Sequence, residues 1–367
     1  MRPPELRTGS CVSTSVRRCV LALALAACGG GKAAQQPTTP ASQPAAAAPR
    51  PQPGDEPSYS DIQPEAQPAT NPPAPEPPPS GPAIAGPKPP TLDLPPDKRA
   101  AMVQEQLRKA EQALKARDAD GAVRAARAAL DADESNIPAM IRLAHGYYLK
   151  GYDDKVEAVL TIAKRQREGD QSPILWMLLG LTYDRENRED DALAAYEKAT
   201  SLRPDYIAAL HNKGTIHLKR KRYADAVGVF ERLVSLQSQS PRAHTYLGAA
   251  YRGRSADDPQ NRDALLRKSE QELKLAQTIN PAYAPAFFNL GILYLDADPF
   301  PGLDGLPRMQ NAQKYLAEYK QKAGPGGVAI VDDYLAAAQK GIEREQKALE
   351  RKKKKDAQAQ KKKAGEK

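Results

Sequence analysis

Apolar residues recur every three or four positions from about Lys98 onward, and charged residues fill the positions between them. This spacing predicts amphipathic helices rather than strands. A longer regularity lies on top of it, because Gly146, Gly180, Gly214 and Gly248 stand 34 residues apart. A fixed period of this length is typical of repeat proteins, in which each unit buries its apolar face against its neighbours. We therefore predict an all-α solenoid.

One repeat carries the pattern in its clearest form. Trp176, Leu179 and Tyr183 form an i, i+3, i+7 stripe on a first helix, and Gly180 lets a second helix approach closely. The repeat resembles the tetratricopeptide repeat (TPR) family at every signature position: Trp176, Leu179, Gly180, Tyr183, Ala192, Tyr196, Ala199 and Pro204. Gly146, Gly214, Gly248 and Gly291 occupy the same glycine position in other repeats. The resemblance implies a TPR solenoid, which is a right-handed superhelix of helical hairpins.

The predicted solenoid spans residues 97–327 and contains about six repeats. Two later repeats carry insertions, "GRSADDPQNRD" and "DADPFPGLDGLPR", and both fall in the turn between the two helices of a hairpin. Such insertions leave the stacking intact and often build a binding surface, although simple loop growth explains them equally well. The predicted repeats are 103–136, 139–172, 173–206, 207–240, 241–283 and 284–325, and the second of them keeps Gly146 and Ala158.

A capping helix is predicted over residues 328–350, with Val328, Val331, Leu335 and Ile342 facing the stack. The basic tail at 351–367 has nine basic and two acidic residues, and we expect it to extend this helix into solvent. Attraction of an anionic partner is the alternative role of these lysines.

The N-terminus predicts a processed and lipid-anchored chain. Residues 20–27 give eight mostly apolar residues after two arginines, too few to span a bilayer but suited to a signal peptide. Residues 25–28, Leu-Ala-Ala-Cys, resemble the lipobox of bacterial lipoproteins, which implies cleavage after residue 27 and lipid on Cys28. The other two cysteines, Cys11 and Cys19, would be lost with the signal peptide. Gly29 lacks the aspartate associated with inner-membrane retention, so the resemblance implies an outer-membrane anchor facing the periplasm.

Residues 28–96 are predicted to be a disordered tether. They contain 21 of the 34 prolines and few aromatic residues, so they cannot bury enough apolar area to offset the entropy of ordering. The formal charge of +9 lies mostly at the two ends of the chain, which leaves the predicted solenoid nearly neutral. A balanced solenoid argues against nucleic-acid binding.

Catalytic chemistry has no candidate in this sequence. An enzyme needs converging reactive groups, and neither a phosphate-binding glycine loop nor a nucleophile elbow appears. The four histidines lack the i, i+4 spacing of a helical metal site and suit packing or groove lining: His145, His211, His217 and His244. We predict no cofactor, no metal and no small-molecule substrate.

The resemblance also implies a ligand groove. In TPR proteins, positions 2, 5, 9 and 12 of the first helix commonly face a bound peptide. The apolar character of these positions here favours a peptide or helix bound through its apolar face. The candidate groove contacts are Met140, Leu143, Tyr147, Ile174, Met177, Leu181, His211, Thr215, Phe288 and Ile292.

These features together predict a scaffold for other envelope proteins, anchored in the outer membrane. The layout of lipobox, proline-rich tether, TPR block and "DPFPGLDGLPR" insertion is similar to that of the TPR lipoproteins of gliding motility. An assembly factor or pilotin for an outer-membrane pore, pilus or secretion system shares the anchor and the solenoid. A glycan-processing envelope enzyme is the alternative from another class, and it lacks a candidate carboxylate pair.

Overall fold

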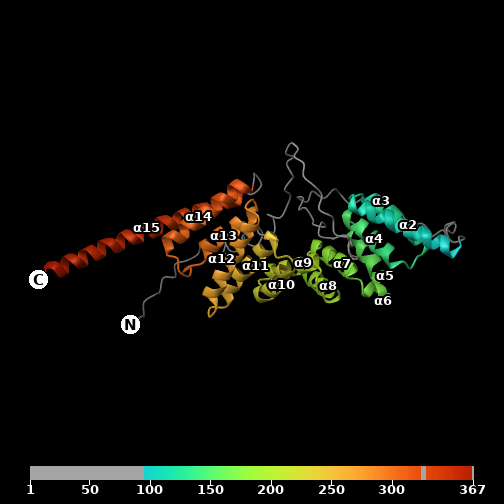
Figure 1. The fold of residues 1–367 in the computed structure, drawn as a ribbon, viewed down its shortest axis with the longest axis horizontal. Coiled ribbons are helices and arrows are strands. Elements are labelled where there is room, and N and C mark those ends of the chain that lie inside the picture. The colour runs from blue at the N-terminus through green and yellow to red at the C-terminus, as the bar shows by residue number, and fades with distance from the viewer. Residues whose placement is uncertain (1–94, 324–327, 366–367) are drawn as a thin grey trace, which may run out of the picture. The chain divides into compact units, whose positions relative to one another are not determined.

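The computed structural model describes residues 95–323 and 328–365 (Figure 1). These residues form fourteen helices and an isolated bridge between Phe300 and Leu303, without a β-strand among them. The predicted all-α helical repeat fold is therefore confirmed. The predicted signal peptide and tether lie outside the described residues.

The described chain divides into two compact units, one ending at Ile216 and one beginning at His217, so that α9 (Ile207–Lys219) contains the boundary. The other helices of the N-terminal unit are α2 (Pro96–Lys115), α3 (Ala119–Ala132), α4 (Ile137–Leu149), α5 (Asp153–Lys164), α6 (Arg167–Asp170), α7 (Pro173–Arg185) and α8 (Glu189–Leu202). Those of the C-terminal unit are α10 (Tyr223–Leu236), α11 (Pro241–Asp257), α12 (Arg262–Ile279), α13 (Ala284–Asp296), α14 (Gly305–Lys322) and α15 (Val328–Gly365).

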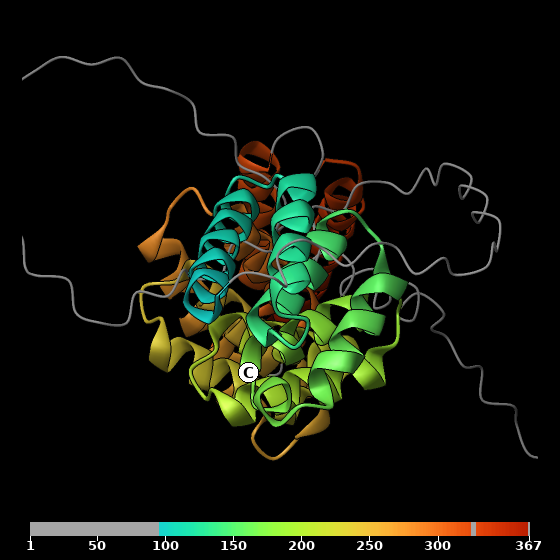
Figure 2. The same cartoon turned by 90° about the vertical axis from the view of Figure 1, so that its right-hand side faces the viewer.

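Helix starts in the N-terminal unit follow directly from the local sequence. Asn136 accepts a hydrogen bond from the Ala139 amide at 3.0 Å and caps α4. Ser172 does the same for α7 through the Leu175 amide at 3.3 Å, and Pro173 follows it at the position where a helix needs no N–H donor. The helices then pack on their neighbours, as α2, α3 and α4 do (Figure 2).

A residue in the left-handed backbone conformation recurs in the turns between paired helices. Arg117 and Gly151 are 34 residues apart with φ of 55° and 74°, and Asn187 and Lys221 are 34 residues apart with φ of 60° and 59°. Residues other than glycine rarely adopt this conformation. Its recurrence at the repeat spacing therefore comes from the geometry of the hairpin and not from the local residue type.

Close helix crossings depend on the predicted glycines. A Cβ placed on Gly180 would lie 2.5 Å from the ring of Tyr196, which is fully buried on the paired helix α8. A Cβ on Gly248 would likewise lie 2.6 Å from Leu273 of α12, and one on Gly291 would lie 2.6 Å from Leu316 of α14. In each hairpin the glycine hydrogen leaves room for a large side chain of the partner helix.

The second predicted repeat departs from this arrangement. A Cβ on Gly146 would lie 2.8 Å from Val123 of the preceding helix α3, so this glycine serves the contact with α3 rather than with its own partner helix α5. Ala158, which the repeat pattern predicts at the helix crossing, is exposed. Helix α5 instead buries the stripe of Val156, Leu160 and Ala163. The prediction for Ala158 is wrong, because a larger branched residue two positions earlier takes the inward place.

The helices extend beyond the expected repeat bounds at two places. Helix α2 begins at Pro96, seven residues before the predicted first repeat at 103. Most of the first insertion is helical, because α11 and α12 have 17 and 18 residues against 13 and 14 for α7 and α8. The insertion therefore lengthens the hairpin and leaves only a short connection.

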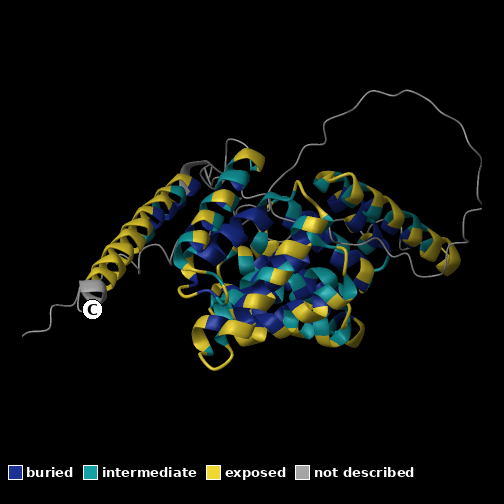
Figure 3. Ribbon diagram, turned by 60° about the vertical axis from the view of Figure 1, so that its left-hand side comes forward, coloured by how far each residue is buried: buried dark blue, intermediate teal, exposed yellow. Residues whose placement is uncertain are grey.

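Helix α15 packs on α14 and α13 and closes the end of the C-terminal unit. Its inner side places Val331, Tyr334 and Ala338 in the core, with Ile342 also buried and Leu335 packed against the same cluster. The helix continues past residue 350 to Gly365, as expected for a basic tail that extends the capping helix. Beyond the packed part its surface is exposed (Figure 3).

Candidate protein-interaction surface

Most predicted groove contacts are buried. Met140, Leu143, Tyr147, Met177 and Leu181 each have a relative exposure of 8% or less. They belong to α4 and α7, which pack against each other within the N-terminal unit. Apolar side chains at these positions therefore stabilise the stacking of repeats and offer little area to a ligand.

Phe288 and Ile292 of α13 are enclosed in the core of the C-terminal unit. The Phe288 ring lies 5.0 Å from Tyr319 of α14 and 5.7 Å from Tyr334 of α15, centroid to centroid. Ile292 has no exposed area. Their prediction as groove contacts is wrong for this structure, because the capping helix covers the face that a ligand would use.

Three predicted groove residues keep part of their surface. Ile174, His211 and Thr215 are half-buried. The Thr215 hydroxyl donates to the carbonyl of His211 at 2.9 Å, and His211 Nδ1 lies 3.2 Å from the Asn212 amide oxygen. Their contact with a partner stays a prediction.

The most distinctive surface of the N-terminal unit is formed by Arg127, Tyr147, Lys150, Tyr152 and Lys155, which we call the tyrosine–lysine surface. Tyr152 is 43% exposed, although it is a large aromatic residue. The Lys155 ammonium lies 4.6 Å from its ring centroid, and that of Lys150 lies 5.4 Å away. Arg127 donates to the Tyr147 hydroxyl at 2.6 Å. Residues from α3, α4, α5 and the turn at Tyr152 thus meet at one place.

The five residues of this surface include three cations, Arg127, Lys150 and Lys155. Lys150 forms an ion pair with Asp120, which lowers the pKa of that carboxyl and raises the pKa of the lysine. Asp120 neutralises one of the three cations, and Arg127 and Lys155 are the other two. Tyrosine and arginine are enriched in binding hot spots, and the two lysines add positive charge that a partner's carboxylates can meet. The predicted apolar groove does not include Lys155 or Arg127. Neither residue stands at a repeat position that would mark it as part of a binding site.

Signature residues of the third repeat serve packing. Ala192, Tyr196 and Ala199 are fully buried, and Leu179 is almost so. Trp176 is half-buried and its indole N–H donates to the carbonyl of Asp170 at 2.8 Å. Among the other signature residues, Gly214 and Gly248 are buried, whereas Pro204 is exposed.

Tyrosines on the first helix of a hairpin bond to the preceding helix. Tyr183 donates to Glu157 at 3.2 Å, and Tyr294 donates to Glu270 at 2.5 Å. Tyr251 donates in the same way to Glu231 of α10 at 2.5 Å. Burial, followed by the nearby carboxylate, raises the pKa of Tyr183 to about 12. The Tyr183 phenol therefore stays protonated at neutral pH and links the repeats as a hydrogen-bond donor.

The buried histidines His145 and His244 are part of the packing between helices. His145 is 5% exposed, and burial lowers its pKa from 6.5 to about 4. His244 places its ring nitrogens 2.6 Å from Glu272 and 2.9 Å from the Ser238 carbonyl, so it joins α12 to the connection before α11. Within residues 95–323 and 328–365, His, Cys, Asp and Glu side chains form no cluster of three that could hold a metal ion.

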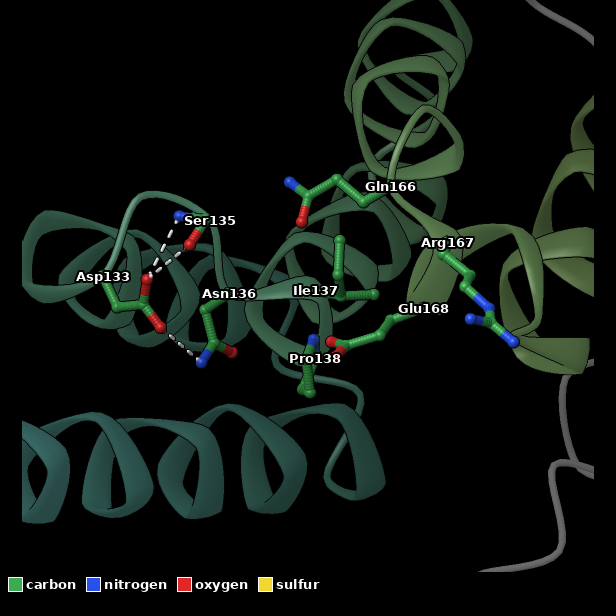
Figure 4. Close-up of a pocket in the computed structure, with 8 residues that line it drawn as sticks. All are labelled: Asp133, Ser135, Asn136, Ile137, Pro138, Gln166, Arg167 and Glu168. Carbon is green, nitrogen blue, oxygen red and sulfur yellow. Dashed lines mark hydrogen bonds between the residues drawn. The ribbon is translucent and has the colours of Figure 1, made fainter.

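A pocket of about 410 Å³ lies where the α3–α4 connection faces the start of α6 (Figure 4). Three of its polar residues are engaged in the turn itself, because Asp133 accepts hydrogen bonds from Ser135 at 3.0 Å and from the Asn136 side chain at 3.0 Å. The bond from Asn136 lowers the pKa of Asp133. The pocket is therefore a feature of the connection between repeats.

The second insertion folds inward. Phe300 is 5% exposed and its ring lies 5.2 Å from that of Tyr294, while Leu303 packs against the same core. Arg308, to which the repeat pattern gives no role, is 1% exposed and donates to the Tyr294 carbonyl at 2.9 Å. Phe300 and Leu303 of "DPFPGL" are therefore packed into the fold, whereas Pro299 is exposed, and a binding role of this insertion stays a prediction.

Cys28 lies outside the described residues, so the structure gives no view of the predicted lipidation site. No helix within the described ranges has both the length and the apolar character needed to cross a bilayer.

Comparison with known proteins finds the repeat family. Residues 177–241 match the model of the tetratricopeptide repeat family. A stretch of 69 residues is 32% identical to the tetratricopeptide repeat domain-containing protein PYG7, chloroplastic, of Arabidopsis thaliana; it covers 18% of this chain and 23% of that protein. The chain thus matches about a quarter of this relative's length.

Solved structures with a similar fold include two that cover about half of this chain or more. PilF of Pseudomonas aeruginosa has a TM-score of 0.50 and 15% identity, over 64% of this chain and 99% of PilF. MamA of Desulfovibrio magneticus RS-1 has a TM-score of 0.40 and 21% identity, over 51% of this chain and 92% of that one. At this identity the likeness to PilF is evidence for the fold alone.

Proposed function

We propose that this chain, which is a tetratricopeptide repeat protein, acts as a non-catalytic scaffold that binds other proteins. Its helical hairpins use glycines at the crossings and buried aromatic residues for stacking, which fixes the position of the side chains left at the surface. A rigid array of this kind presents an extended surface to a partner.

The tyrosine–lysine surface is the observation that carries this proposal. Tyr152 offers an aromatic ring with 43% exposure, and Lys155 and Lys150 stand over it. Arg127 is fixed by its bond to Tyr147. A partner segment with carboxylates beside an apolar or aromatic residue is complementary to this surface, because the carboxylates meet the cations and the apolar group meets the ring.

Photo-crosslinking in the native cells tests the scaffold proposal. Tyr152 is replaced by benzoylphenylalanine, which keeps an aromatic ring, and Leu275 serves as a control because it is 40% exposed in the other unit. We expect a discrete protein adduct from position 152 and none at the same mass from position 275. Adding Lys155→Glu should reduce the adduct about tenfold, since it opposes an acidic partner. An adduct that is insensitive to this charge reversal would contradict the proposed recognition.

We further propose that the scaffold is anchored in the outer membrane by lipid on Cys28 and serves an envelope complex, namely the gliding motility machinery. Support comes from the sequence: the lipobox-like residues 25–28, the following Gly29, and the proline-rich stretch before the repeats. A tether of this composition would allow the repeat units to reach partners away from the membrane.

Cell fractionation and motility assays test this finer proposal. Cys28→Ser should move the protein from outer-membrane fractions to the soluble periplasm, because a chain without the thiol cannot be acylated there. Deletion of the gene should abolish single-cell gliding while growth and envelope integrity persist. Retention of the variant in the outer membrane would refute the anchor. Normal gliding combined with an unassembled outer-membrane pore would assign the scaffold to pore assembly instead.

A further inference from the structure

We propose that the distal part of α15, residues 351–363, is a docking segment for the surface of an anionic phospholipid bilayer. We call these residues the lysine segment. The inference needs neither the anchor at Cys28 nor the partner of the tyrosine–lysine surface, and it concerns the opposite end of the chain.

The lysine segment is helical, and its side chains are exposed as far as Lys361, the last residue whose side chain is described. Helix α15 buries Tyr334, Ala338 and Ile342 against the C-terminal unit, but every described side chain from Gln346 to Lys361 is exposed (Figure 3). Glu350 and Lys354, like Lys352 and Asp356, stand four residues apart, a spacing at which opposite charges favour a helix. The helix is thus extended well past the residues that the cap requires.

Charge is the main property of this extension. Residues 351–365 contain eight basic residues and one acidic residue. Lys352, Lys353, Lys354 and Lys355 follow one another, so on a helix they point in four directions about 100° apart. Cations therefore surround the helix, and any side of it that meets an anionic surface presents positive charge.

The type of residue favours a lipid surface over a protein or nucleic-acid partner. Seven of the eight cations are lysines, which act as hydrated point charges, whereas arginine is preferred for paired contacts to a carboxylate or a nucleic-acid phosphate. After Leu349 the helix has no aromatic or large apolar residue to fill a pocket in a protein or to stack on a base. Diffuse attraction to a layer of headgroups requires neither.

The same composition defines how the segment binds. Without aromatic or large apolar residues it cannot insert into the acyl region, so it lies on the headgroups and is held by charge alone. Binding of this kind is strongly dependent on salt. The consequence for the molecule is that its C-terminal unit is held near an anionic membrane.

Vesicle co-sedimentation tests the inference with the full chain carrying Cys28→Ser, so that lipid attached to residue 28 plays no part. The probes are vesicles of phosphatidylcholine alone and vesicles with about 30 mol% phosphatidylglycerol. Replacing Lys352, Lys353, Lys354 and Lys355 by Gln should weaken binding to the anionic vesicles about 30-fold. Replacing Lys98, Lys109, Lys221 and Lys340 by Gln removes the same charge elsewhere and should change binding less than about threefold.

Each other outcome decides against the inference. Equal binding to neutral and anionic vesicles would exclude charge as the cause, and equal loss in both variants would assign binding to net charge rather than to the lysine segment. Tighter binding to duplex DNA than to the vesicles, at equal phosphate concentration and about 0.15 M salt, would replace the bilayer by a nucleic acid. Circular dichroism of both variants at equal concentration establishes that they are folded.

Discussion

Replacing Arg308 with alanine is expected to lower the free energy of unfolding of the C-terminal unit by about 2–4 kcal/mol, because two backbone carbonyls lose their donor. The guanidinium is 1% exposed, yet it carries a full charge. Its Nη1 donates to the carbonyls of Tyr294 at 2.9 Å and Leu295 at 3.3 Å, and its Nη2 lies 3.0 Å from Asp298 Oδ2. Burial lowers the pKa of Arg308, and the nearby carboxylate of Asp298 opposes this effect.

The large effect follows from what the side chain leaves behind. The last carbonyls of a helix have no partner within it, and Arg308 satisfies two of them at the end of α13. It also ties the second insertion to the core through Asp298. Arg308→Met fills the same volume without donating, so it should still lose about 2 kcal/mol.

Urea unfolding followed by circular dichroism measures these changes. Arg344→Ala is the matched control, because its guanidinium lies 3.9 Å from the same Asp298 carboxylate but is 63% exposed. This control should change stability by less than about 0.5 kcal/mol. Hydrogen exchange in residues 297–304 should rise in Arg308→Ala only. Equal stability of Arg308→Ala and Arg344→Ala would show that burial of the first guanidinium contributes nothing.

The hairpin fold could be predicted because its determinants are local and periodic. Gly180 and Tyr196 occupy fixed positions in a repeat of 34 residues, and each is needed for the same close crossing. Helix starts such as Ser172–Pro173 are also encoded within a few residues. Where local signals agree with the packing, the sequence alone is sufficient to identify the fold.

Features that depend on several repeats at once could not be predicted. Ala158 matches a signature position, but Val156 is the residue that packs inward, because α5 begins two residues earlier in the 34-residue register than α8. Phe288 has the position of a groove residue and is covered by α15, whose placement no periodicity specifies. Arg308 belongs to a residue type that is almost never fully buried, so hydrophobic patterning excludes it from the core.

The interaction surface illustrates the same limit. The repeat register predicts Tyr147 as a groove contact, but its ring is buried while its hydroxyl accepts from Arg127. Tyr152 and Lys155 lie in a turn and on the outside of α5, where no repeat position marks them. Contacts among α3, α4 and α5 bring these residues together. The site is therefore a product of tertiary packing, and the periodic sequence specifies only its scaffold.

Mild acid is expected to destabilise the N-terminal unit through His145. Burial lowers the pKa of this histidine from 6.5 to about 4 in the folded chain. The unfolded chain therefore binds a proton at a higher pH than the folded chain, and stability falls as the pH drops through the range between these two values. From pH 7.5 to pH 5 the loss is about 2 kcal/mol, and it approaches about 3 kcal/mol near pH 4.

The single tryptophan makes this measurement specific to one unit, because Trp176 lies on α7 in the same unit as His145. Urea unfolding followed by its fluorescence should give a lower midpoint at about pH 5 than at about pH 7.5. His145→Gln, which cannot gain the proton, should lose most of this dependence, whereas His211→Gln at a half-buried position should keep it. Glu111 and Asp133 contribute little to the change above about pH 5. The folded structure lowers the pKa of both carboxyls, so the stability that they provide is lost mainly at more acidic pH. A midpoint in His145→Gln that still drops as far as in the unmodified chain would mean that another group senses the acid.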